Sequence, residues 1–251
     1  FSMRTLLTQI AVLALAATGV SLEAETRADW RTVPFMDAPL PYVIISVPIK
    51  GGSCEPLLFD TGTNLSRLAP SLASRLGLTH GRSTTVSATQ GDGQGTLGHV
   101  MGLGWDVTNR DEPGLAISSD MMSLRRLIGP VSGIYGQSLL GSVDYLIDYR
   151  ARRLILAPSS ALAPMIAGER VPLIWSEGRP ALAATVQARK DRAPVAARLV
   201  LDSGIDHAVL FGKLADDVSR NGLSAAVAIE TAFGSRIAGV ASVKLRVAGR
   251  D

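Results

Sequence analysis

The sequence predicts a mainly β protein with a few short helices, built from two copies of one structural unit. Two observations support this prediction. After about residue 30, short apolar segments alternate with turns, and the chain of 251 residues contains 25 glycines and 13 prolines. An aspartate that follows an apolar run and precedes a small hydroxyl residue then occurs twice, at Asp60 and Asp202.

The apolar runs at 42–50, 56–60 and 145–156 are the clearest strand candidates. Two other stretches, 64–78 and 210–223, favour short helices instead. Each ends in a Gly-Leu pair, and a glycine at that position is typical of a helix C-terminal cap.

The two aspartates have matching surroundings. Val33 precedes Asp60 by 27 residues and Val171 precedes Asp202 by 31, and a predicted helix follows each aspartate. The segment 157–170 between the copies is rich in Ala, Pro and Ser, as a boundary should be. We therefore predict an N-terminal lobe at 30–158, a linker at 159–170 and a C-terminal lobe at 171–251.

A single Asp-Thr-Gly or Asp-Ser-Gly tripeptide indicates only a turn after a strand. Two copies, each behind three apolar residues, suggest a shared site in which two carboxyl groups face each other. Such a pair cannot ionise fully at low cost, so one member holds a proton while the other is charged. The pair then supplies a general acid and a general base at one place.

Four segments carry a resemblance to a known family: 59–78, 89–100, 132–156 and 199–211. With them, the chain resembles aspartic peptidases of the pepsin and retropepsin type, in particular bacterial secreted aspartyl proteases with two retropepsin-like lobes. The resemblance extends from about Val33 to the end of the sequence. It implies a bilobal aspartic-protease fold and an endopeptidase that hydrolyses peptide bonds with a water molecule, without cofactor or metal.

The resemblance also implies roles for individual residues. Asp60 and Asp202 would form the catalytic dyad, and peptides or proteins would be the substrates. The loop-bracing, flap and strand residues that it implies are Thr61, Gly62, Ser203 and Gly204 for the loops, Gly91, Asp92, Gly93, Gln94 and Gly95 for the flap, and Ile134, Tyr135 and Gly136 for the apolar strand beside the site. The segment 232–240 would be the counterpart of the flap.

The second copy departs from the family pattern. From Asp60 to Leu156 is 96 residues, but only 49 residues follow Asp202. No partner of the Ile134-Tyr135-Gly136 segment follows the second motif, so we expect an incomplete C-terminal lobe. We expect a monomer, although the sequence is also compatible with a dimer.

Composition excludes several other classes. The net charge is +3, but the 25 Lys and Arg residues are scattered, which argues against a nucleic-acid partner. Cys54 is the only cysteine, so we expect no intrachain disulfide and interpret it as a buried or half-buried thiol. The three histidines lack the short spacing that would place two metal ligands on one helix face.

The first 24 residues have the layout of a secretory signal peptide. Arg4 precedes a short apolar stretch that ends in small residues, while Phe1 and Ser2 look like an upstream remnant. We expect export to the periplasm or the exterior and no stable membrane span after cleavage. An uncleaved N-terminal anchor is the alternative.

The motifs are also compatible with three other functions. The two Asp-x-Gly motifs also resemble the phosphate loops of actin-like and Hsp70-like ATPases. In those proteins the first loop turns directly into a strand, whereas a helix is predicted here. Aspartyl-phosphate enzymes carry a lysine where this chain has Thr61. A bilobal peptide-binding or inhibitor module without catalysis is the third alternative.

Overall fold

The computed structural model describes residues 30–38, 42–78, 81–88, 91–108, 111–140, 143–187, 192–220, 225–231 and 234–247. Most regular structure within these ranges is strand, which confirms the prediction of a mainly β protein. The predicted signal peptide at 1–24 lies outside the described residues. None of the helices in the described ranges combines the length and hydropathy needed to cross a bilayer.

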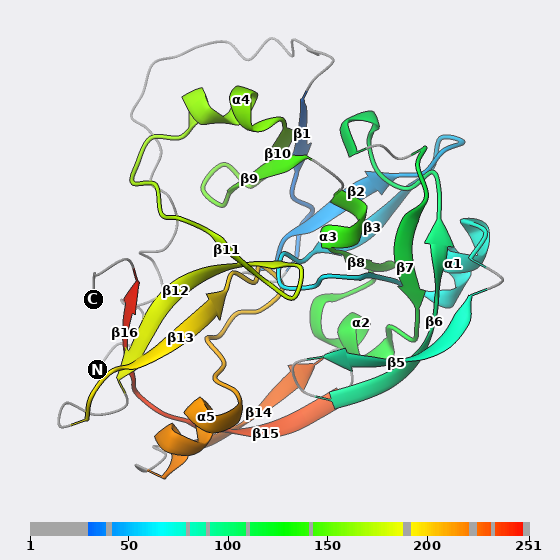
Figure 1. The fold of residues 1–251 in the computed structure, drawn as a ribbon. Helices are drawn as coiled ribbons and strands as arrows, with labels where there is room; N and C mark the ends of the chain where they lie inside the picture. Colours follow the sequence, from blue (N-terminus) through cyan, green and yellow to red (C-terminus); the bar gives the residue numbers. More distant parts are fainter. Residues whose placement is uncertain are drawn as a thin grey trace.

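A seven-stranded sheet dominates the N-terminal half, residues 30–157 (Figure 1). In spatial order its strands are β2 (Ile44–Pro48), β3 (Cys54–Phe59), β8 (Gly133–Tyr135), β4 (Ser66–Leu68), β7 (Gly114–Ser118), β6 (Gly91–Val100) and β5 (Arg82–Ala88). The sheet is mixed: β3 runs parallel to β8, and β8 runs antiparallel to β4. One face carries a large core around Phe59 and Tyr135, and the other face packs against helix α2 (Met122–Ile128).

The helix predicted at 64–78 is correct only in its second part. Ser66–Leu68 form β4, which hydrogen-bonds to β7 and β8, and helix α1 is limited to Pro70–Arg75. Pro70 suits the first helical position because its missing N–H would have no helical partner there. Gly77, with φ +78°, ends the helix, so the predicted glycine cap is confirmed.

The run at 145–156, predicted as one strand, is a hairpin. Its strands are β9 (Asp144–Asp148) and β10 (Arg153–Ala157), and β1 (Arg31–Pro34) pairs with β10 to complete a three-stranded sheet. The polar segment between the strands forms the turn. Asp148 stabilises it by accepting a hydrogen bond from the Ala151 amide at 2.9 Å.

Two helical turns occupy the start of the predicted linker: α4 (Ser159–Leu162) and the 3-10 helix η2 (Ala163–Met165). Beyond it, the C-terminal half, residues 171–247, contains a four-stranded sheet and a separate two-stranded hairpin. The sheet consists of β11 (Ile174–Ser176), β12 (Arg179–Gln187), β13 (Val195–Val200) and β16 (Lys244–Val247), and the hairpin of β14 (Ala225–Thr231) and β15 (Gly234–Val240).

Helix α5 (Gly212–Ser219) falls within the second predicted helix, whose proposed glycine cap at 222 lies outside the described residues. The order of elements repeats between the halves. An antiparallel pair, a loop with an aspartate, a helix and a hairpin occur in each, as β2, β3, α1, β5 and β6 and again as β12, β13, α5, β14 and β15.

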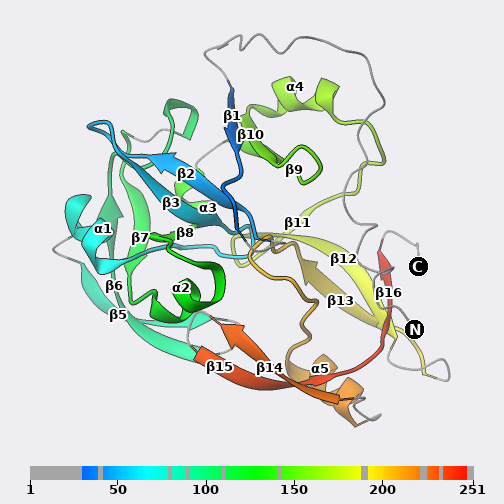
Figure 2. The same ribbon diagram turned by 180° about the vertical axis from the view of Figure 1, so that it is seen from behind.

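The two halves lie against each other in Figure 1 and in the reverse view of Figure 2. The loops after β3 and β13 meet near the middle of the molecule, and the β5–β6 and β14–β15 hairpins approach each other end to end. Strand β14 also lies against α2 of the N-terminal half.

The interpretation of Cys54 as a buried or half-buried thiol is wrong, because the residue is exposed. It begins β3 at the end remote from Asp60. Only the later residues of that strand, Leu57 to Phe59, enter the core.

Candidate active site

Asp60 lies directly after the buried end of β3. Leu57, Leu58 and Phe59 are each at most 2% exposed and anchor the strand in the core. The Asp60 amide still donates to the Tyr135 carbonyl of β8 at 3.1 Å, so the aspartate is held where the sheet ends. Its carboxylate Oδ1 accepts the Gly62 amide at 2.8 Å, which closes a tight turn. The strand therefore places the carboxyl group, and the turn fixes its orientation.

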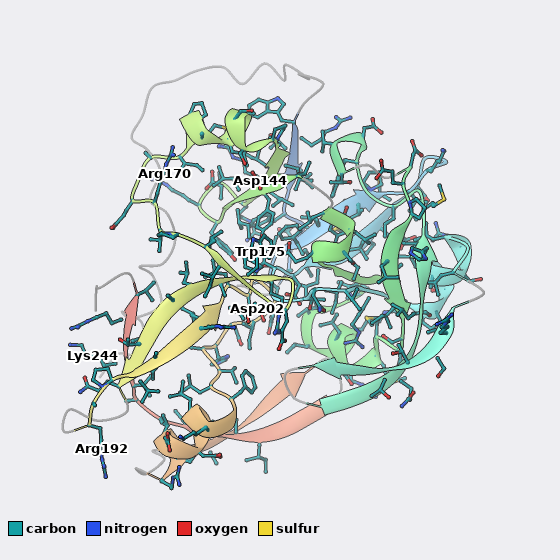
Figure 3. The ribbon with its side chains drawn as sticks, viewed as in Figure 1. Asp144, Arg170, Trp175, Arg192, Asp202 and Lys244 are labelled. Carbon is teal, nitrogen blue, oxygen red and sulfur yellow. The ribbon has the colours of Figure 1, made fainter. Side chains whose placement is uncertain are left out.

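Asp202 occupies the same place in the second copy. It follows β13, and its Oδ1 accepts the Gly204 amide at 2.8 Å, the same distance as in the first loop. Figure 3 labels Asp202 near the middle of the molecule, where the C-terminal half meets the N-terminal half. The internal repeat seen in the sequence is thus reproduced in the local hydrogen bonding of both loops.

Thr61 and Ser203 link the two loops by reciprocal hydrogen bonds. The Thr61 hydroxyl donates to the Leu201 carbonyl at 2.6 Å and accepts the Ser203 amide at 3.0 Å. The Ser203 hydroxyl in turn donates to the Phe59 carbonyl at 2.8 Å and accepts the Thr61 amide at 3.1 Å. Both side chains are buried. Four bonds with this twofold relation fix the position of one aspartate relative to the other.

The glycines allow the loops to touch. A Cβ atom on Gly62 would lie 2.3 Å from Cγ of Asp202, and one on Gly204 would lie 2.7 Å from Cγ of Asp60. Either contact is shorter than a side chain tolerates, so only glycine fits at these two positions. Each carboxyl group therefore lies against the backbone of the opposite loop.

The surroundings of Asp60 favour its protonated form. Burial is the main cause, followed by repulsion from the charge of Asp202, and together they raise the pKa of Asp60 from 3.8 to about 7. Hydrogen bonds from Thr63 and the Gly62 amide act in the opposite direction and limit the rise. Asp60 is buried while Asp202 is half-buried. The arrangement can hold one proton and one charge between the two groups near neutral pH.

The two loops differ at their fourth residue. Thr63 donates its hydroxyl hydrogen to Oδ2 of Asp60 at 2.7 Å, but the equivalent position after Asp202 is Ile205, which has no hydroxyl. The sequence prediction missed Thr63, although its place directly after the Asp-Thr-Gly motif was a usable signal. The hydroxyl bond makes the two carboxyl groups chemically unequal.

Strand β8 and the two residues that follow it contact the first loop. A Cβ atom on Gly136 would lie 2.6 Å from the Thr63 carbonyl oxygen, so glycine is required there as well. Gln137, which the sequence prediction did not include, donates from its amide to Thr63 at 3.0 Å and from its side chain to Thr61 at 3.0 Å. Ile134 packs toward α2, whereas Tyr135 enters the core on the other face. The expected apolar strand therefore lies beside the loop.

The predicted flap residues lie on an antiparallel hairpin. In β6, Gly93, Gln94 and Gly95 pair with β5, and Gln94 donates to the Thr85 hydroxyl at 3.4 Å. Gly91 and Asp92 begin the strand, and the connecting residues 89–90 lie outside the described residues. Within the expected counterpart at 232–240, Gly234–Val240 form β15, which pairs with β14 in a second hairpin. The connecting residues 232–233 lie outside the described part.

No cluster of three metal-ligating side chains occurs among the described residues. A hollow of about 570 Å³ lies elsewhere in the N-terminal half, lined by Leu76, Gly77, His99, Met101 and Pro113, none of which belongs to the loops. The labelled Arg170, Arg192 and Lys244 lie at separate places along the edge of the molecule in Figure 3.

The raised pKa of Asp60 predicts a specific dependence of stability on pH. Between pH 3.8 and about 7 the folded protein keeps a proton that the unfolded chain loses. The contribution of Asp60 to the free energy of unfolding is complete below pH 3.8 and disappears as the pH rises through 7, by about 1.4 kcal/mol for each unit of raised pKa. Urea unfolding of the wild type and Asp60→Asn at pH 4, 5.5 and 7 measures this term. Parallel pH profiles of the two proteins would contradict it.

A comparison with protein-family models and with curated proteins finds no match for this sequence. The geometry of the two loops is therefore the basis on which function is inferred.

Proposed function

We propose that the protein is a bilobal aspartic endopeptidase in which Asp60 and Asp202 activate a water molecule to hydrolyse peptide bonds. The observation that carries this proposal is the reciprocal bonding of Thr61 and Ser203. It joins two structurally equivalent loops and holds their carboxyl groups against each other. A turn at a strand end would not require such a link between distant parts of the chain.

The proposed chemistry uses the single proton of the pair. The ionised carboxylate removes a proton from water, and the water oxygen attacks the carbonyl carbon of the scissile peptide bond. The protonated carboxyl group donates a hydrogen bond to the carbonyl oxygen, which becomes negatively charged. A proton then passes to the amide nitrogen, the C–N bond breaks, and the products leave with one new carboxyl group and one new amine. No covalent bond forms between the enzyme and the substrate.

The bilobal arrangement gives the remaining elements their proposed roles. The halves before and after residues 159–170 would be the two lobes, and the β5–β6 and β14–β15 hairpins, whose ends approach each other, would cover a bound peptide. The two ends of an extended peptide bound between the hairpins would extend out on either side of them. We further propose that the protein is exported, because residues 3–20 have the layout of a secretory signal.

One argument against the ATPase alternative fails, but the structure supplies a stronger one. The expectation that a helix directly follows the first loop is wrong, since β4 comes before α1. However, the two loops are in direct hydrogen-bonded contact, and the position of a Cβ on Gly62 is already filled by Asp202. A triphosphate between the loops would have to break these bonds. The contact therefore favours a carboxyl dyad over a nucleotide site.

Hydrolysis of a fluorogenic peptide library between pH 3 and pH 8, with and without pepstatin, tests the proposed function. Cleavage that pepstatin inhibits and chelators do not inhibit is the expected result. In H2(18)O, the new C-terminal carboxyl group should gain one heavy oxygen atom per cleavage. A folded protein that binds peptides without cleaving any of them would support the alternative of a non-catalytic binding module.

A further inference from the structure

A buried arginine lies on the same face of the sheet as Asp60. Arg67 on β4 is directly opposite Ile134 on β8, which is opposite Leu58 on β3. Residues opposite each other on neighbouring strands project from the same face, and residues two apart on one strand share a face. Asp60 directly follows β3, two positions after Leu58, and its amide still pairs with Tyr135 of β8. The alternation of the strand therefore places the Asp60 side chain on the α2 side, with that of Arg67. Their strands are separated only by β8, or about 10 Å between backbones.

The environment of Arg67 is unusual for a cation. The residue is 4% exposed. The residues paired with it on the two neighbouring strands, Ile117 of β7 and Ile134 of β8, are both apolar. Its guanidinium donates from Nε and Nη2 to the Ser119 hydroxyl at 3.2 and 3.0 Å. Burial lowers its pKa to about 10, while attraction from Asp60 and then Asp120 raises it. Arg67 thus remains charged at neutral pH, where a buried cation needs a nearby anion.

We propose that Arg67 is a positioning residue for the dyad, whose positive charge favours the ionised form of Asp60. This inference rests on the proposed function, because it assigns a charge partner to the same site. With Arg67 present, the pair keeps its single negative charge down to a lower pH than two buried carboxyl groups alone would. Because Arg67 is buried, it is not available to a substrate side chain and acts through Asp60.

Other charged and titratable groups share this environment. Asp202 opposes Arg67 by repelling the charge of Asp60, and the Thr63 hydroxyl supports it. Asp120, exposed after β7, is a second anion near Arg67. The phenol of Tyr145 stays neutral because burial raises its pKa, and on α2 the Arg125 side chain donates to the Val131 carbonyl.

Carbon-13 NMR of labelled aspartate carboxyl groups tests the proposal without a substrate. The signal of Asp60 is assigned by its loss in Asp60→Asn. In Arg67→Met, which removes the charge and keeps an unbranched chain, the titration midpoint of Asp60 should rise by about one pH unit. In Arg67→Lys, which keeps the charge, it should rise by less than half as much. Ser119→Ala, which removes only the hydroxyl partner, should also have the smaller effect.

An unchanged Asp60 midpoint in folded Arg67→Met overturns the proposal. If Arg67→Met is unfolded at neutral pH, the double variant Arg67→Met/Asp60→Asn decides, since removal of the unpaired carboxylate should restore folding. A double variant that stays unfolded overturns it as well. If the protein hydrolyses peptides, the acidic limb of its pH profile of kcat/KM should shift together with the titration midpoint of Asp60. Absence of peptidase activity would contradict the proposed function, whereas a fixed midpoint would contradict only the role of Arg67.

Discussion

Replacing Asp60 or Asp202 with asparagine is expected to lower kcat for peptide hydrolysis by about 10³-fold or more. Either substitution leaves only one carboxyl group, so the site loses the combination of a base for water and an acid for the carbonyl oxygen. Asparagine keeps an oxygen that can accept the Gly62 or Gly204 amide, so the turns should persist. KM should change little, because the lost interactions belong to the transition state.

The matched controls are Asp37→Asn in the N-terminal half and Asp216→Asn on α5, both exposed. They change the net charge by the same amount and should retain wild-type kcat. Thermal unfolding of all four variants separates loss of chemistry from loss of structure. Full activity in either folded Asp60→Asn or folded Asp202→Asn would refute the dyad.

Replacing Thr61 with valine is expected to destabilise the protein by about 2–5 kcal/mol. Valine has nearly the same shape but no hydroxyl group. The substitution leaves the Leu201 carbonyl without its donor at 2.6 Å and the Ser203 amide without its acceptor at 3.0 Å, and the Thr61 site is buried. Urea unfolding measures the change, and Thr32→Val on the exposed part of β1 is the control for a threonine outside the site.

Ser203→Ala should act on the same contact from the opposite loop. Because the two hydroxyl groups join one hydrogen-bonded unit, the double variant should be less destabilised than the sum of the single variants, with a coupling of about 0.5–3 kcal/mol. Activity should fall in each variant, since the loops hold the carboxyl groups in place. Strictly additive effects would show that the two residues stabilise their own loops independently.

The parts of the site that the sequence predicted are those with a local pattern. Asp60, Thr61 and Gly62 recur as Asp202, Ser203 and Gly204, and the repeat indicates that they act together. The apolar-apolar-Gly segment was expected from the family resemblance, and it lies beside the first loop. Such motifs are visible in a sequence because the backbone conformation they need restricts the residues nearby.

The errors arose where pairing between distant segments overrides local preference. Residues 66–68 resemble the start of a helix, yet they form a strand because β7 and β8 are available on both sides. The run at 145–156 is apolar at both ends, but its polar middle turns so that β10 can pair with both β1 and β9. Neither partner can be identified from the segment itself.

The sequence by itself therefore determined a mainly β protein with an internal repeat and two equivalent aspartates, because these follow from apolar periodicity and turn residues. Only the tertiary structure decided how the aspartates are arranged and what surrounds them. It placed each carboxyl group against the opposite glycine, gave Asp60 a hydroxyl partner that Ile205 denies to Asp202, and buried Arg67 on the same face. Burial and charge proximity set proton affinity, and both depend on residues that are close in space but far apart in the chain.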